Sequence, residues 1–260
     1  MELDGRVAVV TGGTRGVGAG IARAFLRAGA RVVVCARRPP DVTLDGAEFV
    51  TVDLREAEEV AGFFDDVAAR YGRLDTLVNN AGGTPHRLLA DGAAARHARV
   101  VELNLVTPLT ASLAAYDHLR AARGSIVMIG SVSGGRPSPG SAAYGAAKAG
   151  LESLARSMAV EWAPDVRVNT LVLGMVRTEL SGLHYGDEEG IAAVGRTVPL
   201  GRLAEPSDVG DAAVFLASER AAYISGASLL LHGGGERPAF LDAATVNRET
   251  VHDGRQGDVR

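Results

Sequence analysis

Short apolar segments alternate with amphipathic segments along most of the chain, and this alternation restricts the fold more than any other feature of the sequence. The apolar segments are nearly continuous, as expected for strands of a parallel sheet that is covered on both faces. The segments between them repeat apolar residues at helical spacing, and in 56–71 Val60, Phe63, Phe64 and Val67 fall on one side. Strands are expected at 6–10, 31–36, 48–52, 74–79, 125–130, 167–173 and 228–232, and helices at 16–28, 56–71, 93–122, 142–162 and 206–218.

These elements predict an α/β fold: a single-domain, doubly wound parallel sheet of the Rossmann type, with about seven strands and helices on both faces. A length of 260 residues suits one such domain. We place this domain at 1–235 and expect 236–260 to be a tail that is partly mobile, above all in its last ten residues. The helix at 93–122 should consist of two pieces that meet near Asn104 and Pro108.

Residues 175–202 interrupt the alternation with a stretch rich in glycine and charge. A long segment after the carboxyl end of a strand is typical of a loop or lid that covers a substrate. We assign this role to 175–202, with a disordered surface loop as the alternative.

The overall composition speaks against several kinds of partner. A net charge of −4 gives no sign of a nucleic-acid-binding surface, and no apolar run approaches the roughly 20 residues of a membrane span. The first residues lack a basic-then-apolar signal pattern. Cys35 lies in an apolar run, as small core residues do, which fits a reducing cytoplasm. We therefore expect a cytoplasmic protein with a small-molecule substrate and without nucleic acid, membrane or metal.

A glycine-rich turn follows the first expected strand, where residues 11–18 read TGGTRGVG. Glycines at 12, 16 and 18 let backbone N–H groups approach a pyrophosphate, and the helix that follows points its positive end toward the phosphates. This arrangement predicts a dinucleotide site formed by Gly12, Thr14, Arg15, Gly16, Val17 and Gly18.

The end of the second expected strand indicates which dinucleotide binds. Folds that select NAD place an acidic residue there to bond the ribose 2′-hydroxyl, whereas this chain has Ala36, Arg37 and Arg38. Arg15, inside the glycine-rich turn, is directed at the same region. Guanidinium groups suit the roughly two negative charges of a 2′-phosphate. The sequence thus predicts NADP(H), with ordinary solvated arginines as the alternative.

The single lysine of the chain, Lys148, follows Tyr144 by four residues on an expected helix. The two side chains would lie on one face, and a neighbouring ammonium favours phenolate and lowers the pKa of a tyrosine from about 10. Such a phenol suits a general acid that protonates a reduced carbonyl. Because Tyr-x-x-x-Lys also occurs in unrelated helices, chance is the alternative.

These motifs, in this order, resemble the classical form of the short-chain dehydrogenase/reductase family over residues 6–235. Asp53-Leu54 resembles the family's adenine-binding acid, and the NNAG sequence at 79–82 resembles a motif that steadies the central sheet. The family usually has Pro-Gly after its sixth strand, where this chain has Leu173-Gly174. We expect cofactor contacts from Gly12, Thr14, Arg15, Gly16, Val17, Gly18, Arg37, Arg38, Asp53, Leu54, Asn80, Ala81, Gly82, Tyr144, Lys148, Gly174, Val176 and Thr178.

The resemblance implies a catalytic set of Asn104, Ser131, Tyr144 and Lys148. Ser131 lies thirteen residues before Tyr144, the usual interval in the family, and would hold the carbonyl oxygen while Tyr144 gives the proton. Lys148 would lower the pKa of the phenol and bond the nicotinamide ribose. Asn104 would hold a water that resupplies protons through Lys148.

The expected activity is an NADP(H)-dependent oxidoreductase that interconverts a ketone and a secondary alcohol, which is a CH–OH donor enzyme of class EC 1.1.1.-. The chain is similar to 3-oxoacyl-carrier-protein reductases, and Arg136 and Arg177 could attract a carrier phosphate. A hydroxysteroid or other alicyclic alcohol dehydrogenase is an alternative, and a non-catalytic NADP(H) sensor is another. The family implies a homotetramer or homodimer. Substrate contacts are expected from Ser133, Arg136, Met175, His184 and Tyr185.

Overall fold

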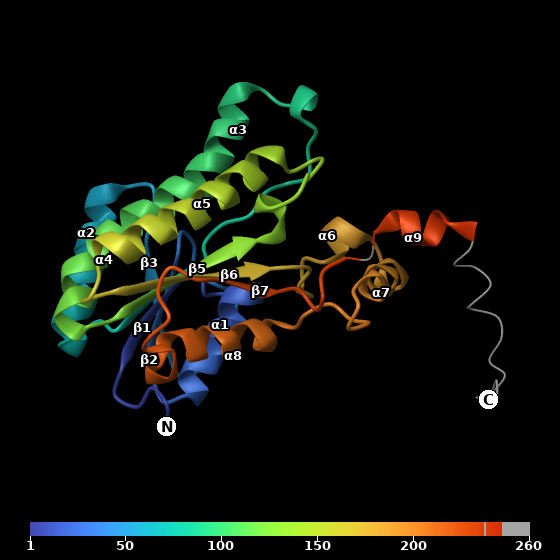
Figure 1. Ribbon diagram of the computed structural model, residues 1–260. Coiled ribbons are helices and arrows are strands. Elements are labelled where there is room, and N and C mark those ends of the chain that lie inside the picture. Colours follow the sequence, from blue (N-terminus) through green and yellow to red (C-terminus); the bar gives the residue numbers. More distant parts are fainter. Residues whose placement is uncertain (237, 246–260) are drawn as a thin grey trace, which may run out of the picture.

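The computed structural model describes residues 1–236 and 238–245, and its centre is one parallel sheet of seven strands (Figure 1). The strands are β1 (Val7–Thr11), β2 (Arg31–Ala36), β3 (Ala47–Thr51), β4 (Thr76–Asn79), β5 (Ser125–Ser131), β6 (Arg167–Leu173) and β7 (Ser228–Leu231). Their order across the sheet is β3-β2-β1-β4-β5-β6-β7. This confirms the predicted doubly wound sheet, with the strand bounds within two residues of those expected.

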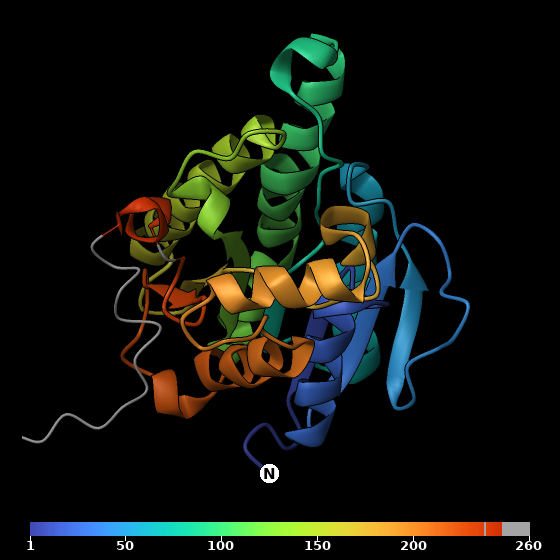
Figure 2. The ribbon, with the colours of Figure 1, turned by 90° about the vertical axis from the view of Figure 1, so that its right-hand side faces the viewer.

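Helices cover both faces of the sheet (Figures 1 and 2). They are α1 (Gly16–Arg27), α2 (Ala57–Tyr71), α3 (Ala94–Val101), α4 (Thr107–Ala122), α5 (Ala142–Glu161), α6 (Gly182–Tyr185), α7 (Glu188–Thr197), α8 (Pro206–Ala217) and α9 (Ala239–Ala243). Alternate strand residues point to opposite faces. Val9 and Val33 pack with α2, α4 and α5, whereas Val10 and Val34 pack with α1 and α8.

The strand order reverses between β1 and β4, because the chain builds β1 to β3 outward and then returns to the other side of β1. In open α/β sheets the ligand crevice lies at the carboxyl ends of the strands at such a switch point. Here those ends are Thr11 of β1 and Asn79 of β4. The glycine-rich turn and the NNAG sequence therefore meet at the crevice.

The long helical region between β4 and β5 is interrupted as expected near Asn104. A π-helical turn, Glu102–Val106, separates α3 from α4. The Asn104 amide nitrogen donates to the carbonyl of Val100, four residues earlier, at 2.8 Å. The side chain thus provides a hydrogen bond to a backbone carbonyl at the widened turn. Among the described residues, no helix is long and apolar enough to cross a membrane.

The segment 175–202 contains the short helices α6 and α7 and is anchored at both ends. Val176 forms a parallel bridge with Ala204, and the Ala204 N–H donates to the Met175 carbonyl at 3.0 Å. The tail begins after β7 and includes α9. The expected mobility of the last ten residues concerns positions outside the described residues, and the division of the chain at 235 stays a prediction.

The crossing of α1 and α8 depends on glycine at the contact. A Cβ at Gly20 would lie 2.3 Å from the Pro206 Cβ and 2.6 Å from the Pro206 carbonyl oxygen. A Cβ at Gly210 would lie 2.8 Å from the Gly20 carbonyl oxygen. Because backbone atoms cannot move aside as a side-chain end can, these helices reach their spacing only with glycine at both positions.

Gly20→Ala should therefore destabilise the protein, although alanine is the better helix former. We expect the free energy of unfolding to fall by about 1–3 kcal/mol, as for other overpacked contacts. Gly62→Ala is the matched control: it lies inside α2 with open space around it and should gain about 0.5–1 kcal/mol. Denaturant unfolding measures both, and a Gly20→Ala protein as stable as wild type would contradict the packing argument.

Candidate active site

Ser131, Tyr144 and Lys148 meet at the carboxyl end of β5. Ser131 is the last residue of β5, and Tyr144 and Lys148 lie one turn apart in the first part of α5. The Ser131 and Tyr144 hydroxyls are hydrogen-bonded, and the Lys148 Nζ lies 5.5 Å from the centre of the Tyr144 ring. The structure thus brings three of the four expected catalytic side chains together.

The Lys148 ammonium is almost completely buried, with 3% of the residue exposed. It donates a hydrogen bond of 2.7 Å to the Ile129 carbonyl on β5. Burial disfavours the charged form and lowers the pKa of Lys148 from 10.5 to about 8. The site surrounds a compact cation closely, and the larger guanidinium of arginine would not fit in the same space.

The pKa of Tyr144 differs from the sequence-based expectation. Burial raises it above its ordinary value, and the hydrogen bond from Ser131 opposes this effect. The expected lowering by Lys148 is absent because the ammonium is directed to the Ile129 carbonyl and is itself disfavoured by burial. In this state Tyr144 is a protonated phenol at neutral pH.

Asn104 reaches the same region from the π-helical turn. Its amide nitrogen donates to the Gly83 carbonyl at 2.9 Å, and its amide oxygen accepts from the Gly83 N–H at 2.9 Å. A Cβ at Gly82 would lie 2.6 Å from the Asn104 Oδ1 and 3.6 Å from the Lys148 Nζ. The absence of a side chain at Gly82 therefore keeps space open between the asparagine and the lysine.

The glycine-rich turn is held against the end of β4 by a small network around Thr11. The Thr11 hydroxyl accepts from the N–H groups of Asn80 and Ala81, both at 3.0 Å. The Asn80 amide donates to the carbonyls of Thr11 and Gly12 at 2.9 and 3.1 Å. A Cβ at Gly18 would lie 2.3 Å from the Gly12 carbonyl oxygen. These contacts leave a narrow, side-chain-free cradle along the turn.

The first turn of α1 follows this cradle, and Thr178 and Glu179 lie beside Gly16, its first residue. Arg15 precedes the helix with no side-chain cap, and the first turn contains no acidic residue. Its first N–H groups therefore keep the hydrogen-bonding capacity and the partial positive charge that favour a phosphate.

The end of β2 presents cations beside the cradle. Arg15, Arg37 and Arg38 are exposed, and none forms an ion pair with another described residue. Asp53, by contrast, is bound by Arg55, whose Nε donates at 2.9 Å, and this contact lowers the pKa of Asp53 to about 2. Arg37 adds to the lowering through its charge. Leu54, beside Asp53, is buried.

Residues 174–178 lie on the other side of the cradle. A Cβ at Gly174 would lie 2.8 Å from the His232 Cβ, so glycine is required where β6 passes the end of β7. Val176 is fixed by its bridge to Ala204, and Thr178 lies near Gly16, at 3.5 Å from the position of a Cβ there. The stretch that contains Leu173 in place of proline thus still reaches the glycine-rich turn.

The expected substrate residues differ in their surroundings. Ser133 donates its N–H to the Ser131 hydroxyl at 3.2 Å. Arg136 is ion-paired with Glu236 of the tail at 2.5 Å. Tyr185 is half-buried, and burial raises its pKa while the charge of Arg136 opposes this. His184 is exposed and Met175 is held by Ala204.

Sequence reasoning missed several residues that shape the site. Thr11 was read as part of a glycine motif, although its hydroxyl is the centre of the network. Asp53 and Arg55 are only two residues apart in the sequence, and this short separation could have suggested their ion pair. Arg87, Arg96 and His97 line a cavity beside the start of α5, and no spacing in the sequence distinguishes them from other surface cations.

Comparisons with known proteins agree with this geometry. Residues 12–236 match the family model described as enoyl-(acyl carrier protein) reductase. The chain is 38% identical to an L-fucose dehydrogenase from Oryctolagus cuniculus, covering 89% of this chain and 85% of that protein. It is 38% identical to a cis-4-hydroxycyclohexanecarboxylate dehydrogenase from Sinomonas cyclohexanicum, covering 88% and 96%. The ligand-free aldohexose dehydrogenase of Thermoplasma acidophilum superposes with a TM-score of 0.85 at 28% identity, covering 89% and 94%.

The burial of Lys148 predicts a particular dependence of stability on pH. Since the pKa of Lys148 is about 8 in the folded protein and ordinarily 10.5, the folded state binds fewer protons between these values. The destabilising effect of Lys148 is therefore complete below pH 8 and is relieved as the pH rises toward 10.5. Lys148→Met should raise the free energy of unfolding at pH 7 by about 1–3 kcal/mol, and this gain should shrink at pH 10.

Arg156→Met is the matched control, because Arg156 lies on the exposed side of the same helix. This substitution removes an exposed cation and should change the free energy of unfolding by less than about 0.5 kcal/mol. Urea denaturation at the two pH values measures both variants. A Lys148→Met protein that is less stable than wild type at pH 7 would show that the ammonium is well solvated or well paired.

Proposed function

Because the chain belongs to the short-chain dehydrogenase/reductase family, we propose that it is an NADP(H)-dependent oxidoreductase that interconverts a ketone and a secondary alcohol by hydride transfer. The family binds a nicotinamide cofactor, and the choice of NADP(H) is our proposal. The observation that carries the activity is the contact of the Ser131 and Tyr144 hydroxyls beside the buried Lys148, at the carboxyl end of the sheet.

The residues of the crevice fit a dinucleotide. The cradle at Gly12 and Gly18 has no room for side chains and is followed by the first turn of α1, which has no side-chain cap. The unpaired Arg15 and Arg37 supply charge for a 2′-phosphate. Asp53 is held by Arg55, so its carboxylate is already partly neutralised where the adenine ring is expected.

The proposed mechanism assigns a separate task to each side chain. The bound nicotinamide supplies or accepts the hydride. The Ser131 hydroxyl donates a hydrogen bond to the substrate oxygen, and Tyr144 gives its proton to that oxygen as it becomes an alkoxide. The raised pKa of Tyr144 keeps the proton in place until a strong base forms beside it.

Lys148 and Asn104 serve the tyrosine in this proposal. The Lys148 ammonium stabilises the phenolate that remains after proton transfer, at short range and away from water. The space at Gly82, between the Asn104 Oδ1 and the Lys148 Nζ, suits a water that returns a proton to the site. In the oxidative direction the same groups accept the proton of the alcohol.

The substrate is better described as a small cyclic alcohol or its ketone than as a carrier-bound acyl chain. Arg136 and Arg177, which were expected to attract a carrier phosphate, are ion-paired with Glu236 and Glu188. The cavity beside Arg177 is also lined by Glu179, Asp187 and Glu205. These carboxylates would repel a phosphate. Dehydrogenases of a sugar and of a hydroxycyclohexane acid among the similar proteins support a cyclic alcohol.

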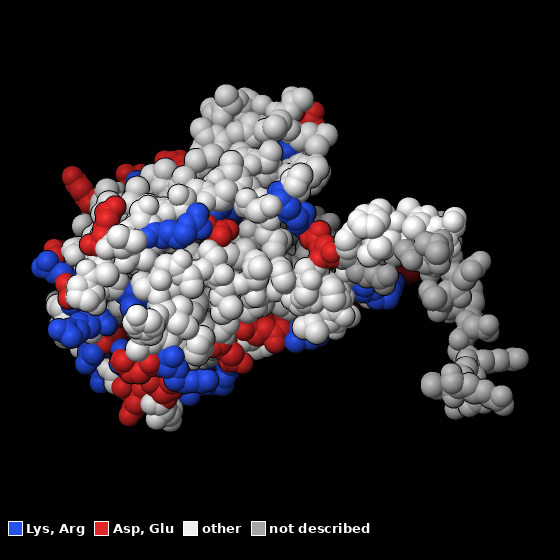
Figure 3. Space-filling model, viewed as in Figure 1, with Lys and Arg blue, Asp and Glu red and all other residues white. Residues whose placement is uncertain are grey.

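We also propose that the protein is a homodimer or homotetramer in the cytoplasm. The edge strand β7 exposes Leu229 and Leu230, 40% and 58% of each residue, and Figure 3 shows a broad uncharged area on this face. An exposed apolar strand edge is a surface that a second copy can cover. Light scattering in solution measures the assembly, and a monomer at micromolar concentration would oppose this part of the proposal.

Cofactor choice tests the arginines at the end of β2. We expect a preference for NADP(H) over NAD(H) of at least about tenfold in kcat/KM, or about 1.4 kcal/mol. Arg37→Ala should remove most of this preference and leave NAD(H) turnover nearly unchanged. Arg23→Ala, an exposed cation on α1 away from the turn, is the control. Equal use of both cofactors by the wild type would overturn the assignment.

Substitutions at the hydroxyl and the ammonium test the catalytic roles. Tyr144→Phe removes the proton donor, and Lys148→Arg places a flat guanidinium where the Ile129 carbonyl and Tyr144 leave room for an ammonium. Each should lower kcat for ketone reduction at least about a hundredfold, or about 2.7 kcal/mol. The two losses should not add in the double variant. Near-normal turnover by Lys148→Arg, with an unchanged melting temperature, would reject the role of Lys148.

A further inference from the structure

A second group of cations lies in the loop after β4 and on α3. Arg87 follows β4 in a loop, and Arg96 and His97 belong to α3. These side chains line a cavity that also includes residues 140–143, which directly precede Tyr144. The cavity is small, with a volume of about 20 Å³. This size suits one small group of a ligand rather than a whole cofactor.

Two polar side-chain atoms of this cavity lack a hydrogen-bond partner among the described residues. Among the described residues, two buried side-chain nitrogens have no hydrogen-bond partner, the Arg87 Nε and the His97 Nε2, and both lie here. Neither Arg87 nor Arg96 forms an ion pair with a described carboxylate. Arg87 donates to the backbone carbonyl of Asp91 at 2.9 Å. Buried donors without acceptors are costly, so the cavity is incomplete as it stands.

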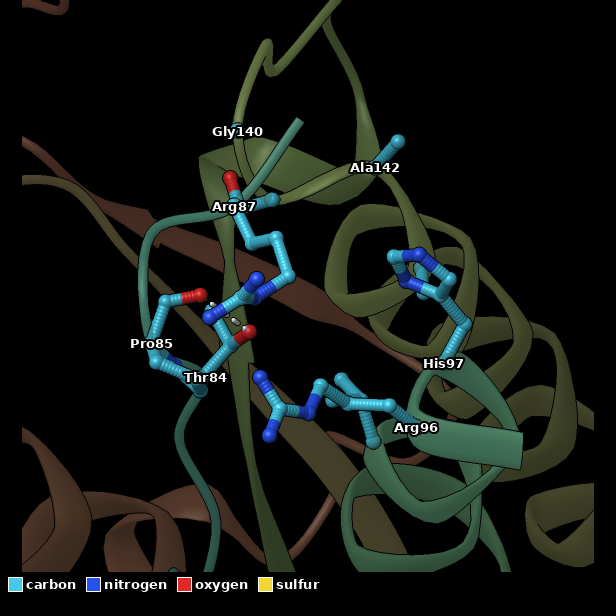
Figure 4. A pocket seen from close by; sticks show the side chains of 10 residues that line it. Thr84, Pro85, Arg87, Arg96, His97, Gly140 and Ala142 are labelled. Atoms are coloured by element: carbon cyan, nitrogen blue, oxygen red, sulfur yellow. Dashed lines mark hydrogen bonds between the residues drawn. The ribbon is translucent and has the colours of Figure 1, made fainter. Parts of the chain in front are cut away.

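The two guanidinium groups extend toward the same space, although Arg96 also remains exposed to solvent. Figure 4 shows Arg87 and Arg96 extending from different walls toward the same space beside Thr84. Two cations that converge on a cavity repel one another unless an anion lies between them. An oxyanion would accept from both guanidinium groups and from the His97 ring.

The backbone around the cavity fixes its position relative to Tyr144. The Arg87 N–H donates to the Gly140 carbonyl at 2.7 Å, and a Cβ at Gly140 would lie 2.0 Å from the His86 Nε2. The loop that bears Arg87 is therefore held against the segment that leads into α5. The first turn of α5 has no side-chain cap and no acidic residue, which adds a favourable field for an anion.

We propose that Arg87, Arg96 and His97 form an oxyanion subsite that binds a carboxylate or phosphate monoester of the substrate on which Tyr144 acts. This inference rests on the proposed function, since it assigns the charged end of the same substrate. The other two arginines that were expected to attract a phosphate, Arg136 and Arg177, are already paired with carboxylates. The subsite makes the enzyme selective for an anionic alcohol or ketone.

Two matched pairs of substrates test the subsite and identify its anion. One pair is 4-oxocyclohexanecarboxylate and its carboxamide, and the other is a hexose 6-phosphate and the free hexose. We expect the anionic member of one pair to exceed its neutral partner at least about tenfold in kcat/KM. A preference in the first pair identifies a carboxylate, and a preference in the second identifies a phosphate. Equal turnover of both members in both pairs overturns the proposal.

Variants show whether the preference comes from these residues. Arg87→Gln and Arg96→Gln should raise KM for the anionic substrate at least about tenfold, with kcat within about twofold and the neutral substrate unchanged. Arg96→Lys should keep part of the effect because it retains a charge. Arg99→Gln is the control, since Arg99 is exposed on α3 outside the cavity. Equal losses for the anionic and neutral substrates would indicate a structural role and reject the subsite.

Binding without turnover separates this inference from the proposed function. Inorganic phosphate and acetate are titrated into the protein, and the ring signals of His97 are followed by NMR. We expect a saturable shift in wild type and Arg99→Gln that is lost in Arg87→Gln. A shift without turnover of any ketone would reject the oxidoreductase and keep the subsite. Turnover without a shift or a charge preference would reject the subsite and keep the oxidoreductase.

Discussion

The hydrogen bonds around Thr11 are the interaction on which the site depends. They join the end of β1 to the end of β4, the two strands between which the sheet reverses its order. Asn80 also donates to the carbonyls at the start of the glycine-rich turn. These bonds hold the turn against the end of β4 and form the floor of the crevice. The direction of α1 and the approach of Thr178 follow from that floor, because both pack against the same turn.

The site lowers the folding stability of the protein through the buried charge of Lys148. An ammonium buried at 3% exposure with a carbonyl as its acceptor is held below its ordinary pKa, and such a charge is unfavourable for folding. The same exclusion of water strengthens the attraction between this cation and any negative charge that forms on Tyr144. A chain that uses arginine almost everywhere else thus keeps lysine where the charge must be compact. Folding stability is lowered at the position where charge stabilisation is most useful.

The sequence was sufficient to predict the features that repeat along the chain or that depend on neighbouring residues. Apolar alternation predicted the sheet and its covering helices, and the break near Asn104 appears as a π-helical turn. The direction of the Tyr144 pKa was wrong because it depends on burial, which no spacing reveals. Likewise, Arg136 and Arg177 were chosen as phosphate-binding candidates from their positions in the sequence alone. Their ion pairs with Glu236 and Glu188 could not be predicted because these partners are distant in the sequence. The roles of the catalytic and cofactor residues remain predictions that geometry supports.

In a chain with so many arginines, the informative property of each is whether a carboxylate already holds it. Surface pairs such as Arg136–Glu236 contribute little to stability, but each one removes a cation from the set that can bind a ligand. Among the described residues near the crevice, arginines without an ion pair include a first group, Arg15, Arg37 and Arg38, at the glycine-rich turn and the end of β2, and a second group, Arg87 and Arg96, beside the start of α5. Tyr144 and Lys148 lie on α5, and the residues at the start of α5 line the cavity of the second group. In the function that we propose, the first group binds the 2′-phosphate of the cofactor and the second binds the oxyanion of the substrate.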